Sequence, residues 1–160
     1  MRHLVITIGC EYGAKGNAIG RKIAEDLNIK FYNRELVDEI IEEVGIPKEI
    51  MENCVIIGRS ADYILKDSDK INLLRAFIYA PDDVRIHNIM ESHNLTEKDA
   101  GILLLEKDKR YHKRHLALTG SNRGDRHNRN ILIDSSYLGT EGTADYIEEL
   151  VRRKFGSGEE

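Results

Sequence analysis

The segment at residues 8–20, IGCEYGAKGNAIG, has the residue types that hold phosphate groups. A phosphate-binding loop reads G-x-x-x-x-G-K-[ST], and Gly9 and Lys15 fit this pattern. Ala14 stands where the second glycine is expected, and Gly16 replaces the Ser/Thr that would hold magnesium. Because glycines let successive N–H groups face an anion, the segment predicts a phosphate cradle. The alternative is a glycine-rich turn that carries a surface lysine.

Two further places could bind a phosphorylated substrate. Arg59 follows the apolar run at 54–58, and its guanidinium could form a bidentate contact with a phosphate. Asp62, three residues later, could hold a metal-bound water or a sugar hydroxyl, or it could form a surface ion pair with Arg59 of little energetic value. Arg34 follows Asn33 after another short apolar run, where a nucleotide kinase would begin to bind its acceptor. Asn33 could equally be a helix N-cap.

A basic stretch extends from residue 107 to residue 129, and within it only Asp108 and Asp125 are acidic. It could be a lid whose cations neutralise a transferring phosphoryl group, a nucleic-acid-binding surface or a solvated helix face. His112 and His115 are three apart without an evident third ligand, so we expect no zinc site. The basic residues are Lys107, Lys109, Arg110, Lys113, Arg114, Arg123, Arg126 and Arg129.

The elements that must position these residues alternate along the chain. Apolar runs at 3–8, 29–33, 54–58, 72–80 and 130–136 predict strands. Helical patterns cover 17–27, 34–44, 81–93, a long segment from Thr96 toward Leu118, and 141–155. This alternation predicts an α/β fold with a parallel sheet covered on both faces. Gly9, Gly58 and Ser135 follow strands, so they should meet at one edge of the sheet.

Composition limits the class of protein. A chain of 160 residues with 41% hydrophobic residues suits one domain, residues 1–160. The net charge of −4 argues against a general affinity for nucleic acid, and no apolar stretch is long enough for a bilayer. The 2 Cys residues show no metal-type spacing and suit the reducing cytoplasm, which is the expected localisation.

Five segments in order resemble the cytidylate-kinase-like family of P-loop nucleotide kinases. They begin with ITIGCEYGAKGNAIGRKIAEDLNIKFYNRELVDEI, followed by CVIIGRSADYIL and FIYAPDDVRIHNIME. The last two are EKDKRYHKRHLALTG and NILIDSSYLGTEGTADYI. The resemblance implies a three-layer αβα P-loop fold with a helical basic lid at about 105–129. By this resemblance, the acceptor-binding segment of such kinases is shortened or missing at 45–53.

The resemblance also implies roles for single residues, with ATP as phosphate donor, a nucleoside monophosphate as acceptor and Mg²⁺ as metal. Lys15, Arg59, Lys109 and Arg110 would be catalytic, and Arg34, Arg59, Asp62, Lys107 and Arg114 would bind the acceptor. Asn17 would contact Mg²⁺ through a water molecule. The donor phosphates would lie against Gly9, Tyr12, Gly13, Ala14, Lys15, Gly16 and Asn17.

Three functions remain open at this point. The first is an ATP-dependent nucleoside monophosphate kinase, with a pyrimidine nucleotide such as CMP as acceptor. The second is a P-loop protein that binds a nucleotide without transferring phosphate, as the changed end of the loop allows. The third, a nucleic-acid-binding domain at 107–129, ranks last, because only Tyr111 and Tyr137 lie near for base stacking.

Overall fold

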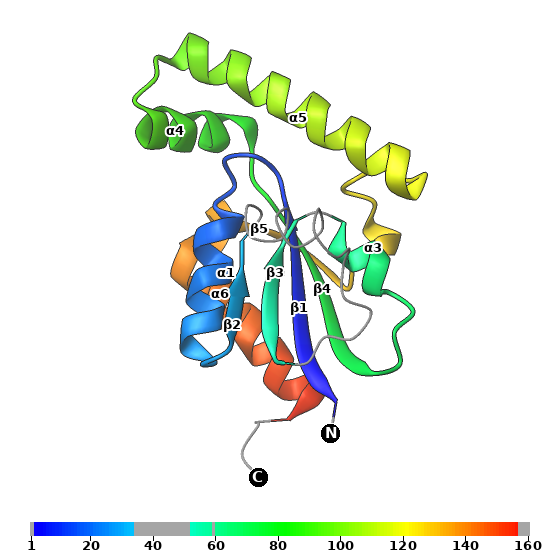
Figure 1. The fold of residues 1–160 in the computed structure, drawn as a ribbon. Helices are drawn as coiled ribbons and strands as arrows, with labels where there is room; N and C mark the ends of the chain where they lie inside the picture. The colour runs from blue at the N-terminus through cyan, green and yellow to red at the C-terminus, as the bar shows by residue number, and fades with distance from the viewer. Residues whose placement is uncertain (1, 34–51, 59, 157–160) are drawn as a thin grey trace.

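A five-stranded parallel sheet forms the centre of the molecule in the computed structural model, which describes residues 2–33, 52–58 and 60–156. The strand order is β2-β3-β1-β4-β5, so β1 lies in the middle (Figure 1). The sheet confirms the predicted parallel α/β architecture. The strands are β1 (His3–Cys10), β2 (Lys30–Tyr32), β3 (Cys54–Ile57), β4 (Ile71–Tyr79) and β5 (Ile131–Asp134).

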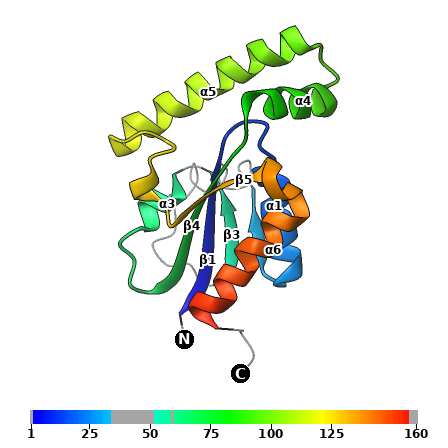
Figure 2. The same ribbon diagram turned by 180° about the vertical axis from the view of Figure 1, so that it is seen from behind.

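The two faces of the sheet are covered by different elements. Ile6 and Ile8 of β1 belong to the larger core, which also contains residues of α1 (Gly16–Asp26) and α6 (Ser135–Phe155). Figure 2 shows α6 lying across this face. Val5 belongs to a second cluster on the other face, where α3 (Ala61–Leu65) packs. Alternate side chains of a strand point to opposite faces, so the apolar run at residues 3–8 supplies both cores.

Helices α4 (Asp82–His93) and α5 (Glu97–Thr119) extend together beyond the carboxyl ends of the strands (Figure 1). Thr96 caps α5: its Oγ1 accepts a hydrogen bond from the N–H of Asp99 at 3.2 Å. Ile89, Ala100 and Leu104 form a small separate core between the two helices. After α5 the chain returns to the sheet through the short 3₁₀ helix η1 (Arg126–Asn128). The basic stretch therefore lies over the edge of the sheet where the loops gather.

The closing helix differs from its prediction. Helix α6 begins at Ser135, not at residue 141, because the Asp134 carboxylate accepts a hydrogen bond from the N–H of Ser136 at 2.8 Å. Gly139, with φ 74° and ψ 179°, interrupts the helix after its first turn. The predicted helix at 34–44 and the shortened segment at 45–53 lie outside the described residues. None of the helices that the structure describes is long and apolar enough to cross a membrane.

Candidate functional site

The loop between β1 and α1 has a backbone that favours glycine at two positions. Gly13 has φ 83° and Lys15 has φ 64°, both in the left-handed region. A Cβ on Gly13 would lie 2.8 Å from the carbonyl oxygen of Arg85, so no side chain fits there without displacement of α4. Gly13 is thus required both by its conformation and by the close approach of a neighbouring helix.

Side chains from two helices hold three successive carbonyl groups of this loop. Arg85 Nε donates to the Tyr12 carbonyl at 2.8 Å, and Asn88 Nδ2 donates to the Gly13 carbonyl at 2.9 Å. Ser135 Oγ donates to the Ala14 carbonyl at 2.7 Å, which brings Ser135 to the loop as predicted. The first N–H groups of α1 have no intrahelical acceptor, and the N-cap residue makes no side-chain cap hydrogen bond. The loop therefore presents donors and a positive helix end to an anion.

The backbone suggests a second alignment of the phosphate-loop pattern, in which each position of the pattern moves one residue toward the C-terminus. The left-handed conformation expected of a glycine occurs at Lys15, whereas Ala14 is not left-handed and is fully buried. Gly16 is the first residue of α1, and a Cβ on it would lie 2.5 Å from Cys10 Cβ. In this alignment Gly16 takes the lysine position and Asn17 takes the Ser/Thr position. The packing against Cys10 explains why neither a lysine nor a hydroxyl residue stands at position 16.

A cavity of about 590 Å³ adjoins the loop, which is within the usual range for small-molecule sites. Its wall combines the loop, the start of α1 and the end of α4. Five predicted donor-site residues line it, namely Tyr12, Gly13, Lys15, Gly16 and Asn17, together with Asn88 and His93 of α4. Lys15 and Asn17 are exposed, so their side chains are accessible to a ligand in this cavity.

A smaller hollow of about 40 Å³ lies beside Gly9 and gathers cationic side chains from the basic stretch. Its lining includes Gly9, Gly58, Ser60 and Asp62 from the sheet side and Arg114, His115, Arg123 and Arg129 from the other side. Gly9 and Gly58 thus share one site, as predicted from their positions after strands. The hollow has three arginines and one carboxylate, which suits an anion.

Arg129 and Asp62 form a buried ion pair in this hollow. Their side chains are 3% and 4% exposed, and Arg129 Nη1 lies 3.0 Å from Asp62 Oδ2. This contact falls outside hydrogen-bond geometry, and Arg129 Nε also has no hydrogen-bond partner among the described residues. Burial lowers the pKa of Arg129, and Asp62 opposes that shift. The guanidinium therefore has unused donors in a low-dielectric place.

His115 connects α5 to the loop after β3. Its Nδ1 lies 2.8 Å from the Oγ of Ser60, the N-cap residue of α3. Burial lowers the pKa of His115 below its ordinary value, so the ring is neutral at neutral pH. A neutral ring can exchange a hydrogen bond with Ser60 without adding to the positive charge of the hollow.

Arg85 is a site residue that the sequence analysis missed. Its side chain is 2% exposed, and its Nη2 donates to Asp108 Oδ1 of α5 at 2.6 Å. The same guanidinium bonds the Tyr12 carbonyl and lies 3.5 Å from Glu11 Oε2. Arg85 therefore links the phosphate loop to α5. The available signal was its place on the same helical face as Ile89, an unusual position for a charged side chain.

Of the remaining predicted residues, some lie near the two cavities and others do not. Lys107 Nζ lies 5.8 Å from the Tyr12 ring, and Arg114 lines the smaller hollow. Lys109 and Arg110 are exposed on α5 and line neither of the two cavities. Ala14 can contribute only backbone groups, since it is fully buried. Arg34 and Arg59 lie outside the described residues.

The solved structures that resemble this chain include one close in overall shape and several distant kinases. An uncharacterized protein from Eubacterium ventriosum superposes with a TM-score of 0.85 at 28% identity, covering 95% of this chain and 100% of its own. Shikimate kinase from Acinetobacter baumannii has a TM-score of 0.54 at 15% identity, covering 96% of both chains. A gluconokinase from Sinorhizobium meliloti has a TM-score of 0.53 at 13% identity, covering 97% of this chain and 99% of its own. The two kinases show that the fold is that of P-loop kinases.

Sequence comparison identifies the family. A curated cytidylate kinase from Thermococcus sibiricus is 25% identical over 158 residues, covering 92% of this chain and 80% of the relative. The model of the cytidylate kinase-like family matches residues 5–53 and 48–137, which together span most of the chain. This protein therefore belongs to the cytidylate kinase-like family.

Proposed function

We propose that this protein is a nucleoside monophosphate kinase that transfers the γ-phosphoryl group of ATP to a pyrimidine nucleoside monophosphate such as CMP. The observation that carries the proposal is the loop at residues 10–16. Three of its carbonyl groups are held by side chains, and it opens onto a cavity of about 590 Å³ next to a cationic hollow. Family membership supports the same reaction class.

The residues divide into a donor side and an acceptor side. The donor phosphates would lie at the N-terminus of α1, where Lys15 borders the cavity. The acceptor phosphate would lie toward Arg114 and Arg129, since these cations line the smaller hollow. Gly9 separates the two sides: a Cβ there would lie 2.9 Å from Arg129 Nη2. An oxygen of the acceptor phosphate would attack the γ-phosphorus of ATP. The bond between the γ-phosphorus and the β,γ-bridging oxygen would break, which gives ADP and a nucleoside diphosphate.

The residues present fit ATP better than they fit a strongly held metal. The first N–H groups of α1 have no intrahelical acceptor, and Lys15, Gly16 and Asn17 at this end of the helix line the cavity. Mg²⁺ would lie near Asn17, whose neutral amide oxygen is a weaker ligand than a carboxylate. When bound with ATP, the metal neutralises phosphate charge, while Lys15 and the cations of α5 act on the same charge from the protein.

The direct test is an ADP-release assay with Mg²⁺, ATP and each nucleoside monophosphate in turn. We expect stoichiometric ADP and nucleoside diphosphate with CMP or another pyrimidine nucleotide, and only background ATP hydrolysis without an acceptor. Nucleotide binding by calorimetry with no product for any acceptor would contradict the kinase. That outcome would support the second candidate, a nucleotide-binding protein without transfer, which the packed Gly16 in the loop favours.

Replacing Lys15 by glycine tests the contribution of the ammonium group without changing the backbone conformation. Because φ is 64° at this position, glycine keeps the loop conformation and relieves a left-handed side chain. We expect kcat/KM to fall about 100-fold with an unchanged or slightly raised melting temperature, since charge stabilisation by one group has this order of effect. The exposed Lys98 on α5 offers a control, because Lys98→Ala removes a lysine far along the helix from the loop. A Lys15→Gly variant with wild-type kcat/KM would exclude a catalytic role for this lysine.

A further inference from the structure

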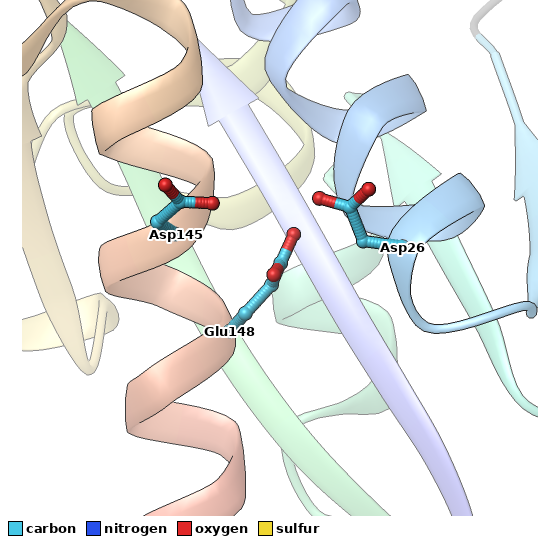
Figure 3. Close-up of side chains that lie close together, drawn as sticks. All are labelled: Asp26, Asp145 and Glu148. Carbon is cyan, nitrogen blue, oxygen red and sulfur yellow. The ribbon is translucent and has the colours of Figure 1, made fainter.

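Three carboxylate side chains converge between α1 and α6, away from the phosphate loop. Asp26 is the last residue of α1, and Asp145 and Glu148 are three residues apart on α6. One oxygen from each lies within 4.8 Å of the others. Figure 3 shows the carboxyl group of Glu148 directed into the gap between Asp26 and Asp145. The loop is at the opposite end of α1, so this cluster is separate from the proposed nucleotide site.

Glu148 provides an observation independent of the clustering. Its side chain is only 5% exposed, yet its Oε1 is buried without a hydrogen-bond partner in the part of the chain that the structure describes. Its other oxygen, Oε2, lies 3.6 Å from Arg152 Nη2. A buried carboxylate oxygen without a donor is costly, and proteins rarely retain one. The site therefore lacks a positively polarised partner for this oxygen.

The charges around the cluster leave an excess of negative charge. Lys22 donates to Asp26 at 2.8 Å, and Arg152 is shared between Glu148 and Glu149. No salt bridge reaches Asp145 from the described residues. Glu141 adds a further carboxylate near Lys22. Burial and the neighbouring Asp26 and Asp145 raise the pKa of Glu148 to about 7, so a proton partly relieves this excess below neutral pH.

We propose that Asp26, Asp145 and Glu148 form a binding site for a divalent cation, with Ca²⁺ as the best-fitting ion. Carboxylate oxygens are the ligands of hard cations, and the cluster contains no histidine or thiol that would select zinc or copper. Ca²⁺ accepts a flexible arrangement of oxygen ligands, whereas Mg²⁺ demands near-ideal octahedral geometry. The three oxygens lie within 4.8 Å of one another, so one Ca²⁺ can contact all three, and water completes the coordination.

The cation would join the C-terminal end of α1 to α6. Both helices pack on the same face of the sheet and contribute Ile23 and Ile147 to its core. Bound Ca²⁺ would give the Glu148 oxygen its missing partner and hold the two helices together. We expect Ca²⁺ to raise the melting temperature, because a ligand that binds only the folded chain stabilises it.

The experiment titrates the nucleotide-free protein with CaCl₂ alone. Calorimetry measures the binding, and thermal unfolding measures the change in melting temperature. We expect one saturable site per chain, at least tenfold weaker binding of Mg²⁺, and a raised melting temperature. Asp145→Asn should weaken Ca²⁺ binding at least tenfold, and Asp145 is exposed, so the variant should fold. Asp83→Asn, a change at an exposed carboxylate on α4, should leave the affinity unchanged.

A second variant tests the buried ligand. Glu148→Gln should abolish saturable Ca²⁺ binding, because it replaces the buried carboxylate with a neutral amide. Absence of saturable binding at millimolar Ca²⁺, or equal binding by the wild type and Asp145→Asn, would overturn the proposal. Because the titration contains no nucleotide, its outcome is independent of whether the protein is a kinase.

Discussion

Replacing Asp62 by alanine is expected to lower the free energy of unfolding by about 3–5 kcal/mol, because it leaves Arg129 buried without its counter-charge. The Arg129 side chain is 3% exposed and lies 5.1 Å from the Phe77 ring, so its charge is poorly solvated without the carboxylate. Urea unfolding, followed by circular dichroism, measures the loss. This change has the largest expected effect on stability, since one buried charge is removed and the other remains.

Two further variants make the result specific. Asp67 is exposed in the turn after α3, and Asp67→Ala should change stability by less than about 0.5 kcal/mol. The double variant Asp62→Ala/Arg129→Met removes both charges and should recover much of the loss, because a buried pair can often be replaced by apolar groups. If the single Asp62→Ala variant loses less than about 1 kcal/mol, the ion pair does not hold this part of the fold.

The double variant also separates the two roles of Asp62. The sequence analysis proposed that Asp62 binds the acceptor, whereas the structure shows it paired with Arg129. If Asp62 or Arg129 contacts the acceptor, the double variant will recover stability but will still show a raised KM for the monophosphate. A normal KM in that variant would limit both residues to a structural role.

Replacing Arg85 by methionine should lower nucleotide affinity at least tenfold and the free energy of unfolding by about 3 kcal/mol. Methionine retains most of the buried volume but loses the charged hydrogen bonds to the Tyr12 carbonyl and Asp108. The loop then loses one of its three carbonyl holders, and α5 loses its connection to the loop. Calorimetry with ATP measures the affinity, and urea unfolding measures the free energy of unfolding.

A graded pair of controls tests the geometry of Arg85. Arg85→Lys keeps the charge but cannot reach Tyr12 and Asp108 together, so it should give an intermediate affinity. Arg153→Met changes an arginine that is 78% exposed and should leave both quantities unchanged. Wild-type affinity in Arg85→Met would show that the loop keeps its phosphate-binding shape without this residue.

The order and type of the elements followed from local patterns in the sequence. Strands appear as short apolar runs and helices as stripes such as Ile19 and Ile23, and both patterns depend on residues a few positions apart. The same locality explains why the start of α6 was predicted six residues too late. Gly139 breaks the apolar pattern, while the cap at Asp134 is a single side chain that starts the helix earlier.

The candidate site was predictable only in part, for the same reason. The loop between β1 and α1 could be singled out because its glycines and lysine are adjacent in the chain. Two of the side chains that hold its carbonyl groups could not be, because Arg85 and Asn88 reach the loop across 73 and 75 residues. Nor could a list of cations along 107–129 tell that Arg129 is buried against Asp62 while Lys109 and Arg110 face solvent.

The amino-acid sequence was therefore sufficient for the family, the parallel α/β fold and the place of the glycine-rich loop between β1 and α1. Each of these depends on residues that are close in the chain or on the order of the segments. The tertiary structure was needed to show that position 15 is left-handed, that Gly16 packs on Cys10, and that three carboxylates meet between α1 and α6. These features depend on contacts between distant segments, and a backbone angle or a buried charge leaves no local pattern in the sequence.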